Sequence, residues 1–330
     1  MALADVIDAL VEAPIGPSFT RVGYEVRSRL EHWRALDSYR ADGRVVVLTG
    51  ATSGLGLAAA EQLARCGATV VLIGRDAERC ERVRSELSAR TGNTSLSTLV
   101  ADLGDLAAVR GAAAELQRRY SVIDVLVHNA GALSAHRQQT ADGLEATVAS
   151  QVVGPFLLTA LLLEQLRAAR SGRVITMSSG GMYASALEVD KLQMGDDYRG
   201  AEQYARAKRA QVTLNEMWAA HPRTTGVTFH AVHPGWADTP GVAASLPTFR
   251  RVVGPLLRSP GQGADTMAWL ALDDAASEVD GRFWLDRRQR PIHRLPTTRR
   301  SDTPERRRAL WNWCAQVAGL DPQTLAELPR

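Results

Sequence analysis

Cysteines and long apolar runs are both scarce in this sequence. The three cysteines, Cys66, Cys80 and Cys314, are scattered, and their spacing fits neither a disulfide framework nor a zinc site. The longest apolar run, residues 156–163, is too short to cross a lipid bilayer and indicates a buried helix instead. We therefore expect no bound metal and a cytoplasmic location, where thiols stay reduced.

The chain also lacks a strong excess of charge of either sign. Its formal net charge is +3 over 330 residues, which argues against nucleic acid as a partner. Hydrophobic residues make up 45% of the chain and charged residues 23%, which is the composition of a globular protein with a sizeable core.

Apolar, β-branched runs alternate with helical segments through the middle of the chain. Strands are predicted at residues 45–48, 69–73, 96–100, 123–127, 173–177 and 227–232, with a short seventh at 281–285. The helical segments include residues 57–66, 77–90, 142–170 and 201–220. This alternation predicts an α/β fold, a Rossmann-like doubly wound parallel sheet of about seven strands with helices on both faces. Because ligands bind beyond the carboxyl ends of such strands, the polar groups that follow each strand are expected to share one crevice.

Two extensions flank this region, which divides the chain into residues 1–40, 41–285 and 286–330. In the first, apolar residues recur at steps of three and four, as expected for one helical face: Phe19, Val22, Val26, Leu30 and Trp33. Arginines lie among them, so the helix could rest on a membrane surface. We favour the alternative, that it packs on its own domain or on a partner subunit.

The last extension is rich in arginine and ends in a helical segment that contains Leu310, Trp311, Trp313 and Val317. Its arginines could grip an acidic substrate tail, a phospholipid headgroup or nucleic acid. We favour a solvated surface segment followed by one amphipathic helix docked on the domain. The arginines are Arg287, Arg288, Arg290, Arg294, Arg299, Arg300, Arg306, Arg307 and Arg308.

A glycine-rich turn, residues 49–56, joins the first predicted strand to the helix that follows it. Its glycines lack a Cβ, so the backbone can turn sharply and approach a pyrophosphate at the helix N-terminus. The spacing G-x-x-x-G-x-G, between a strand and a helix, indicates a dinucleotide site. The candidate cofactor-binding residues of this turn are Gly50, Thr52, Ser53, Gly54, Leu55 and Gly56.

A tyrosine and a lysine four residues apart lie on the predicted helix 201–220. Tyr204 and Lys208 share a helical face, and a nearby cation stabilises a phenolate and lowers its pKa from about 10. Such a tyrosine can exchange a proton near neutral pH. Ser179, at the end of the fifth predicted strand, could hydrogen-bond a substrate oxygen as charge develops on it.

These motifs occur in the order found in the short-chain dehydrogenases/reductases. The set comprises T-G-x-x-x-G-x-G at 49–56, Asn129-Ala130-Gly131, Ser179, Tyr204-x-x-x-Lys208 and Pro234-Gly235. Over residues 42–285 the sequence resembles that family and is closest to its retinol-dehydrogenase-like branch. The resemblance implies an oxidoreductase that moves a hydride between a nicotinamide cofactor and a carbonyl or alcohol group.

The resemblance also implies a role for each matching residue. Tyr204 would be the general acid or base, Lys208 would lower its pKa and hold the nicotinamide ribose, and Ser179 would polarise the substrate carbonyl. Asp102 and Leu103 would line the adenine, and Asn129, Ala130 and Gly131 would support the central strands and the cofactor. Pro234, Gly235 and Thr239 would face the nicotinamide and its carboxamide.

Two positions depart from the family pattern. Gln151 stands where the family usually has an asparagine that holds a water in the proton relay, so the relay could survive with shifted geometry or be impaired. His128 replaces the first asparagine of the usual N-N-A-G, which we interpret as a packing change.

The residues after the second strand favour NADP(H) over NAD(H). Gly74 stands where an acid would bond the ribose 2′-hydroxyl of NAD, and the guanidinium of Arg75 can bind a 2′-phosphate. Asp76 argues weakly the other way.

Because Met182, Tyr183 and Trp236 would lie on the crevice side, together with the apolar tail helix, we expect a mostly apolar small-molecule carbonyl or alcohol substrate. We expect no nucleic acid, and room for a homo-oligomer or a peripheral membrane contact. The alternative is an NADP(H)-binding regulatory or scaffold protein with little or no turnover.

Overall fold

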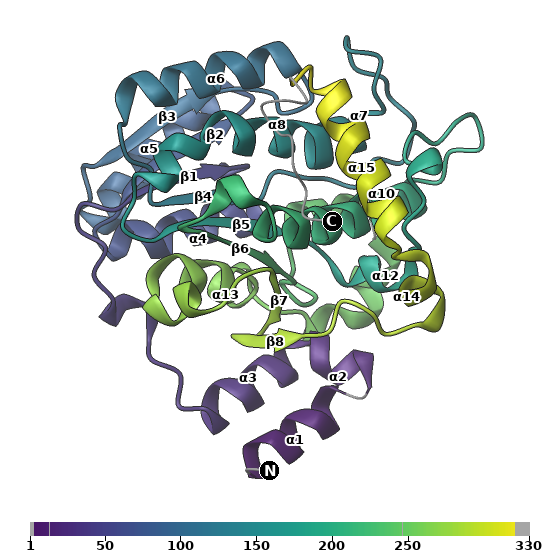
Figure 1. Cartoon of the computed structure of the whole chain (residues 1–330). Coiled ribbons are helices and arrows are strands. Elements are labelled where there is room, and N and C mark those ends of the chain that lie inside the picture. Colours follow the sequence, from purple (N-terminus) through teal and green to yellow (C-terminus); the bar gives the residue numbers. More distant parts are fainter. Residues whose placement is uncertain (1–2, 13, 246, 321–330) are drawn as a thin grey trace.

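The computed structural model describes residues 3–12, 14–245 and 247–320 of the chain (Figure 1). An eight-stranded sheet with the order β3-β2-β1-β4-β5-β6-β7-β8 forms its centre. The first seven strands are parallel, as predicted, and β8 pairs with β7 in the antiparallel sense. The strands are β1 (Val45–Thr49), β2 (Thr69–Gly74), β3 (Leu96–Val100), β4 (Val125–His128), β5 (Gly172–Met177), β6 (Val227–Val232), β7 (Arg282–Leu285) and β8 (Arg288–Arg290).

Helices cover both faces of this sheet, which confirms the predicted doubly wound α/β fold. One face carries α4 (Gly54–Arg65), α5 (Ala77–Thr91) and α13 (Pro260–Leu272), and the other carries α6 (Leu106–Arg119), α8 (Gly154–Leu161) and α10 (Gly200–Ala219). Each face has its own hydrophobic core. Most residues of the central strands are fully buried, which explains why these strands appear in the sequence as continuous apolar runs.

The strand order places a crossover point between β1 and β4. The chain leaves β1 toward β2 on one side and returns to β4 on the other, so the loops that follow these strands diverge at their carboxyl ends. Ligands of open α/β sheets bind at this kind of divergence. The glycine-rich turn after β1 lies there.

The helical stretch predicted at residues 142–170 is interrupted. It comprises α7 (Ala146–Val148), a π-helical segment η2 (Ala149–Val153), α8 and α9 (Leu163–Arg167). Pro155 has no N–H group to donate to residue 151, so the α-helical hydrogen-bond pattern cannot run through this point. The π-helical segment contains Gln151.

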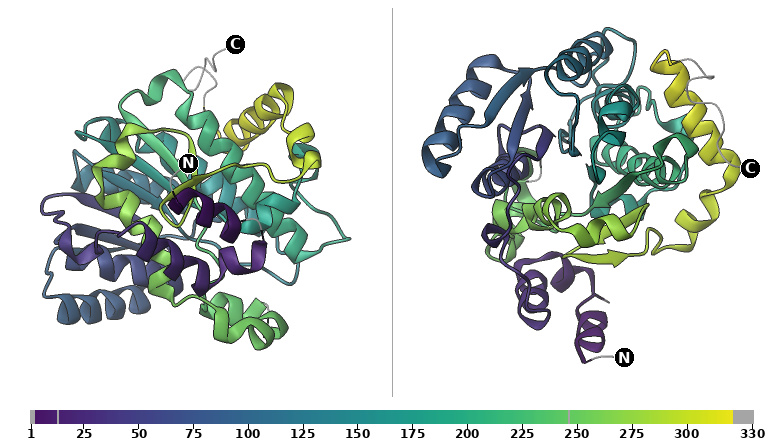
Figure 2. Two further views of the ribbon diagram at one scale, coloured as in Figure 1. Left: turned by 90° about the horizontal axis from the view of Figure 1, so that it is seen from below. Right: turned by 60° about the vertical axis from the view of Figure 1, so that its left-hand side comes forward.

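The N-terminal extension folds as three short helices instead of one amphipathic helix. They are α1 (Leu3–Glu12), α2 (Ile15–Phe19) and α3 (Arg21–Leu30), and they lie beside β7 and β8 (Figure 2). The predicted common apolar face is wrong, because Phe19 is buried in α2 whereas Val22 of α3 is 47% exposed. The break falls at Thr20, whose extended backbone separates α2 from α3.

The favoured expectation for this extension, packing on its own domain, is confirmed by a buried ion pair. The guanidinium of Arg27 is fully buried and donates to Asp286 at 2.6 Å and to Asp8 at 2.7 Å. No helix in the described part of the chain is both long and apolar enough to traverse a membrane.

The arginine-rich tail is largely folded, so the prediction of a solvated segment is wrong for much of it. Arg288 and Arg290 form β8 and pair with Asp8 of the N-terminal extension, and Arg288 also pairs with Glu31. The predicted docked helix is confirmed: in α15 (Pro304–Val317), Leu310 and Trp311 are buried against the core. The last ten residues of the predicted extension lie outside the described residues.

The remaining described α-helices connect these parts. They are α11 (Pro240–Ser245) and α12 (Pro247–Val253), which follow β6, and α14 (Pro296–Ser301), which precedes α15.

Candidate active site

The turn after β1 has the geometry that a pyrophosphate requires. Gly50 and Gly54 adopt positive φ angles of 65° and 53°. A Cβ at Gly50 would lie 2.8 Å from Cα of Ala130, and a Cβ at Gly56 would collide with the carbonyl oxygen of Gly50. The side chain of Ser53 makes no capping hydrogen bond at the start of α4, so the first N–H groups of that helix are free to bind an anion. This turn fits the phosphates of a dinucleotide.

Asn129 braces the turn from the neighbouring strand. Its Nδ2 donates to the carbonyl oxygens of Thr49 (3.1 Å) and Gly50 (3.2 Å). The hydroxyl of Thr49 accepts in return from the backbone N–H groups of Asn129 (3.0 Å) and Ala130 (3.1 Å). The ends of β1 and β4 are therefore fixed relative to each other, and Asn129 acts on the cofactor site by holding Gly50 in place.

Gln151 lies beneath the loop that follows β4. It is fully buried, and its Nε2 donates to the carbonyl oxygen of Ala132 at 2.8 Å. A Cβ at Gly131 would lie 2.9 Å from its Oε1, so the glycine allows the close approach. The backbone carbonyl of Gln151 accepts from Nε2 of Gln211 at 2.6 Å, and the Oε1 atom has no partner among the described residues. The sequence analysis did not identify Gln211 as a partner of Gln151.

Tyr204 and Lys208 project from α10 toward the end of β5. The Nζ atom of Lys208 lies 5.2 Å from the centroid of the Tyr204 ring and donates to the carbonyl oxygen of Met177 at 2.9 Å. Burial lowers the pKa of Lys208 to about 7. Ser179 follows the end of β5, and its side chain lies close enough to Tyr204 to lower the pKa of the phenol. The structure thus brings the three predicted catalytic residues together.

The predicted direction of the Tyr204 pKa shift is wrong in this structure. Burial raises the pKa of Tyr204 to about 12, and the hydrogen bond with Ser179 opposes this only in part. The Nζ of Lys208 donates to the carbonyl oxygen of Met177. Tyr204 is therefore a protonated phenol at neutral pH, ready to donate.

The loop after β6 lies opposite the phosphate turn. Gly235 has a φ angle of 72°, and a Cβ there would collide with the guanidinium of Arg258. A Cβ at Gly54 would lie 3.4 Å from Cβ of Thr239, so Thr239 faces the phosphate turn. The carbonyl oxygen of Pro234 accepts from Nη1 of Arg258 at 3.3 Å. Sequence reasoning did not identify Arg258, which belongs to no motif.

Arg75 and Asp102 lie together at the far end of the crevice. The side chain of Arg75 is 78% exposed, with Nη1 3.9 Å from Oδ2 of Asp102. The carboxylate of Asp76 accepts from the N–H of Arg79 at 2.8 Å and caps α5. Leu103 is buried in the hydrophobic core, which leaves Asp102 as the exposed side chain of this predicted pair.

The apolar residues that were expected to line the crevice are mostly buried elsewhere. Met182 and Tyr183 pack in a small hydrophobic cluster with Phe19 and Phe283. Trp236 lies at the edge of this cluster and is partly exposed.

Comparisons with known proteins agree with this geometry. The sequence profile described as short chain dehydrogenase matches residues 44–248. The chain is 39% identical to dehydrogenase/reductase SDR family member 12 of Bos taurus, over 87% of this chain and 89% of the relative. It is 32% identical to retinol dehydrogenase 12 of Bos taurus, over 84% of this chain and 87% of the relative.

A solved structure from Beutenbergia cavernae also has this fold. It is of an NAD(P)-dependent gluconate 5-dehydrogenase candidate with NADP bound at low occupancy, is 27% identical, and covers 75% of this chain and 96% of its own. The TM-score is 0.61. From these matches and the motifs on the sheet, the chain belongs to the short-chain dehydrogenase/reductase family, in its retinol-dehydrogenase-like branch.

Proposed function

We propose that this chain is an NADP(H)-dependent oxidoreductase that acts on a carbonyl or alcohol group of a mostly apolar small molecule. The observation that carries the proposal is the grouping of Ser179, Tyr204 and Lys208 between β5 and α10, at the same edge of the sheet as the phosphate turn. A bound nicotinamide would supply or accept the hydride.

The chain's own residues would manage the proton. The phenol of Tyr204 is protonated at neutral pH because its pKa lies far above 7, so it carries a proton that it could donate to a carbonyl oxygen that gains charge. Ser179 lies beside Tyr204 and would hold the same substrate oxygen. Lys208, whose pKa burial lowers to about 7, can exchange a proton near neutral pH beside Tyr204.

Three contacts support NADP(H) over NAD(H). A side chain at position 74 would approach within 2.6 Å of Sγ of Cys80, so this position cannot offer the acid that NAD enzymes use. The guanidinium of Arg75 is exposed and has only a long ion pair with Asp102, at 3.9 Å, so it could turn to a 2′-phosphate. The carboxylate of Asp76 is engaged as the N-cap of α5. The NADP in the Beutenbergia cavernae structure points the same way.

An apolar substrate is proposed from Trp236 at the loop after β6 and from the similarity to a retinol dehydrogenase. The family assignment favours an enzyme over the alternative of a cofactor-binding regulator without turnover.

The test is a panel of apolar aldehydes and ketones incubated with the purified chain and either NADPH or NADH. Consumption of the reduced cofactor is followed by its absorbance. We expect turnover with some of the panel and a lower KM for NADPH than for NADH. Tight NADPH binding without turnover of any substrate would support the regulatory alternative instead.

A further inference from the structure

One residue of the N-terminal extension touches both loops that carry the proposed active site. The carbonyl oxygen of Phe19 accepts from the N–H of Trp236 at 2.7 Å. Its ring packs edge-on against His233, with centroids 4.3 Å apart, and against Trp236 at 5.8 Å. A Cβ at Gly180, next to Ser179, would lie 2.8 Å from this ring. Phe19 therefore fills the space between the loop after β5 and the loop after β6.

A buried ion cluster holds this part of the extension in place. The carboxylate of Asp286 forms ion pairs with Arg27 of α3 at 2.6 Å and with Arg258 at 2.5 Å. All three residues are almost fully buried. The Arg258 guanidinium also donates to the carbonyl oxygens of Ser18 (2.9 Å) and Thr20 (3.2 Å), on either side of Phe19. The same guanidinium also donates to the carbonyl oxygen of Pro234, at 3.3 Å, in the loop after β6.

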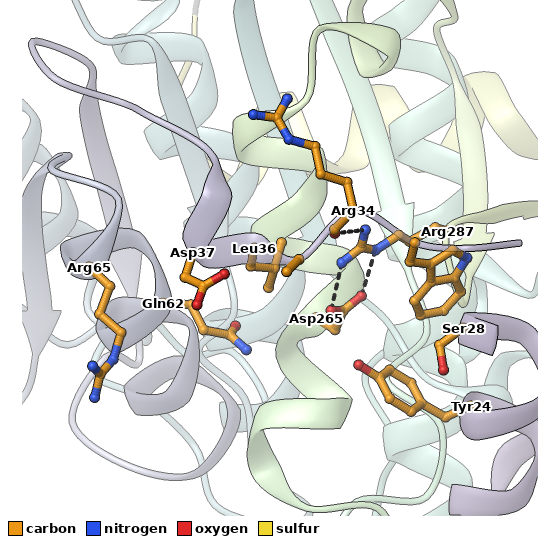
Figure 3. Close-up of a pocket in the computed structure, with 11 residues that line it drawn as sticks. Tyr24, Ser28, Arg34, Leu36, Asp37, Gln62, Arg65, Asp265 and Arg287 are labelled. Carbon is orange, nitrogen blue, oxygen red and sulfur yellow. Dashed lines mark hydrogen bonds and ion pairs between the residues drawn. The ribbon is translucent and has the colours of Figure 1, made fainter.

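A second attachment secures the other end of the extension (Figure 3). Arg287 forms a bidentate pair with Asp265 of α13, at 2.8 Å for both bonds, and donates to the carbonyl oxygen of Arg34 at 2.9 Å. The same guanidinium lies 4.7 Å from the centroid of the Trp33 ring. These residues border a cavity of about 490 Å³ between the extension and α4.

The turn that supplies Asp286 and Arg287 has an unusual backbone. Both residues have positive φ angles, 56° and 54°, in the two-residue turn between β7 and β8. Turns of this type normally contain asparagine or glycine. Here Asp286 and Arg287 each form one of the ion pairs that attach the extension, so the conformation of the turn and the position of the extension depend on each other.

We infer that Phe19 is a positioning residue for the reaction, and that the N-terminal extension fixes the loops of Ser179 and Pro234–Thr239 in their productive arrangement. The inference rests on the proposed function, since it assigns these loops to the reacting end of the cofactor. Among the described residues, Phe19 forms neither a hydrogen bond nor a ring contact with the phosphate turn at residues 49–56, so we expect cofactor anchoring there to be independent of Phe19.

The test compares Phe19→Ala and the milder Phe19→Leu with wild type, and uses Phe156→Leu as a matched control in the core. Phe156 is equally buried but packs on Trp218 and Trp311, away from both loops. We expect kcat to fall about tenfold or more in Phe19→Ala, with KM for NADPH within about twofold of wild type, and Phe19→Leu to restore part of the rate.

Backbone hydrogen exchange gives a readout that needs no turnover. In Phe19→Leu, residues 233–239 and 179–183 should exchange faster than in wild type, whereas residues 50–56 should not. Unchanged exchange in these loops, or a loss of rate no larger than in Phe156→Leu, would overturn the inference. If wild type turned over no substrate, the proposed function would fail, and the exchange data alone would decide whether Phe19 orders these loops.

Discussion

At the scale of single residues, burial sets the protonation states in and around the site. His128 replaces an asparagine of the family pattern, and its Nε2 lies 2.8 Å from the hydroxyl of Thr159 while its Nδ1 has no partner among the described residues. Burial lowers the pKa of His128 to about 3. The folded chain therefore keeps this imidazole neutral at pH values where the unfolded chain protonates it.

This shift predicts an acid sensitivity that depends on His128. Below its ordinary pKa of 6.5 the unfolded chain binds a proton that the folded chain does not, so the free energy of unfolding falls as the pH is lowered from 6.5 toward 3. In His128→Asn this fall should be shallower, by up to about 1.4 kcal/mol per pH unit. Urea titrations at several pH values measure it, with His136→Asn as an exposed control. Parallel pH profiles of the variant and wild type would refute the assignment.

Arg75 is predicted to select the cofactor. Removing the guanidinium in Arg75→Ala should raise KM for NADPH about tenfold or more, because a charge-assisted hydrogen bond to a phosphate is lost, and should leave KM for NADH nearly unchanged. Initial rates with both cofactors measure this. Arg79→Ala, which removes an exposed arginine in the first turn of α5, is the control. An equal effect on both cofactors would contradict a role in selection.

At the scale of elements, the regular part of the fold could be predicted and the irregular parts could not. The parallel strands were predicted to within about two residues, because the central strands are continuous apolar runs that the sheet buries on both faces. Strand β8 was missed because Arg288–Arg290 is short and charged, and its pairing depends on acids nearly 300 positions earlier in the sequence. The sequence predicted η2 and α8 as parts of one helix, because the periodicity of apolar residues does not reveal the π-helical turn before Pro155.

The same contrast holds for the site. Ser179, Tyr204 and Lys208 were predicted from local spacing and from motif order, and the fold brings them together. Phe19, Gln211 and Arg258 were missed because their roles arise from contacts between distant segments, which leave no local pattern. The direction of the Tyr204 pKa shift was also wrong, because helical spacing places Lys208 near the ring without revealing that the carbonyl oxygen of Met177 accepts a hydrogen bond from Nζ of Lys208.

The N-terminus of helix α6 is capped by a single carboxylate, and the contribution of this cap to stability can be tested. The carboxylate of Asp105 accepts from the N–H groups of Ala107 (2.9 Å) and Ala108 (3.0 Å) at the start of the helix. Asp105→Ala should lower the free energy of unfolding by about 1 kcal/mol, because these N–H groups lose their cap. Urea denaturation measures the change, with Glu86→Ala on the exposed face of α5 as the control. A loss no greater than in the control would mean that water replaces the cap at no cost.

At the scale of the whole molecule, the two terminal extensions complete the domain. The acids of the first extension pair with the arginines of the last: Arg290 binds Asp8, and Arg294 pairs with Glu12. Arg27, in the first extension itself, also binds Asp8. Burial opposes ionisation of Asp8, but the hydrogen bonds from Arg290 and Arg27 outweigh it and lower the pKa of Asp8 to about 2. The arginine-rich tail thus finds acidic partners within its own chain.

The docked helix α15 is predicted to be a full part of the core. Trp311 packs with its ring centroid 4.6 Å from Trp218 and 5.0 Å from Phe156. Trp311→Ala should lower the free energy of unfolding by about 3–5 kcal/mol, since it leaves a large cavity, whereas Asn312→Ala on the exposed side should cost less than about 0.5 kcal/mol. Denaturant unfolding of both variants measures this. Similar stabilities would show that the helix packs only loosely on the domain.

The central claim is that Tyr204 transfers the proton in a reaction that this fold carries out with NADP(H). The most direct measurement is the turnover rate of Tyr204→Phe against wild type on one accepted carbonyl substrate, with NADPH binding measured in parallel. We expect a loss of about 100-fold or more in kcat with NADPH affinity nearly unchanged. Equal rates in the two proteins would contradict it.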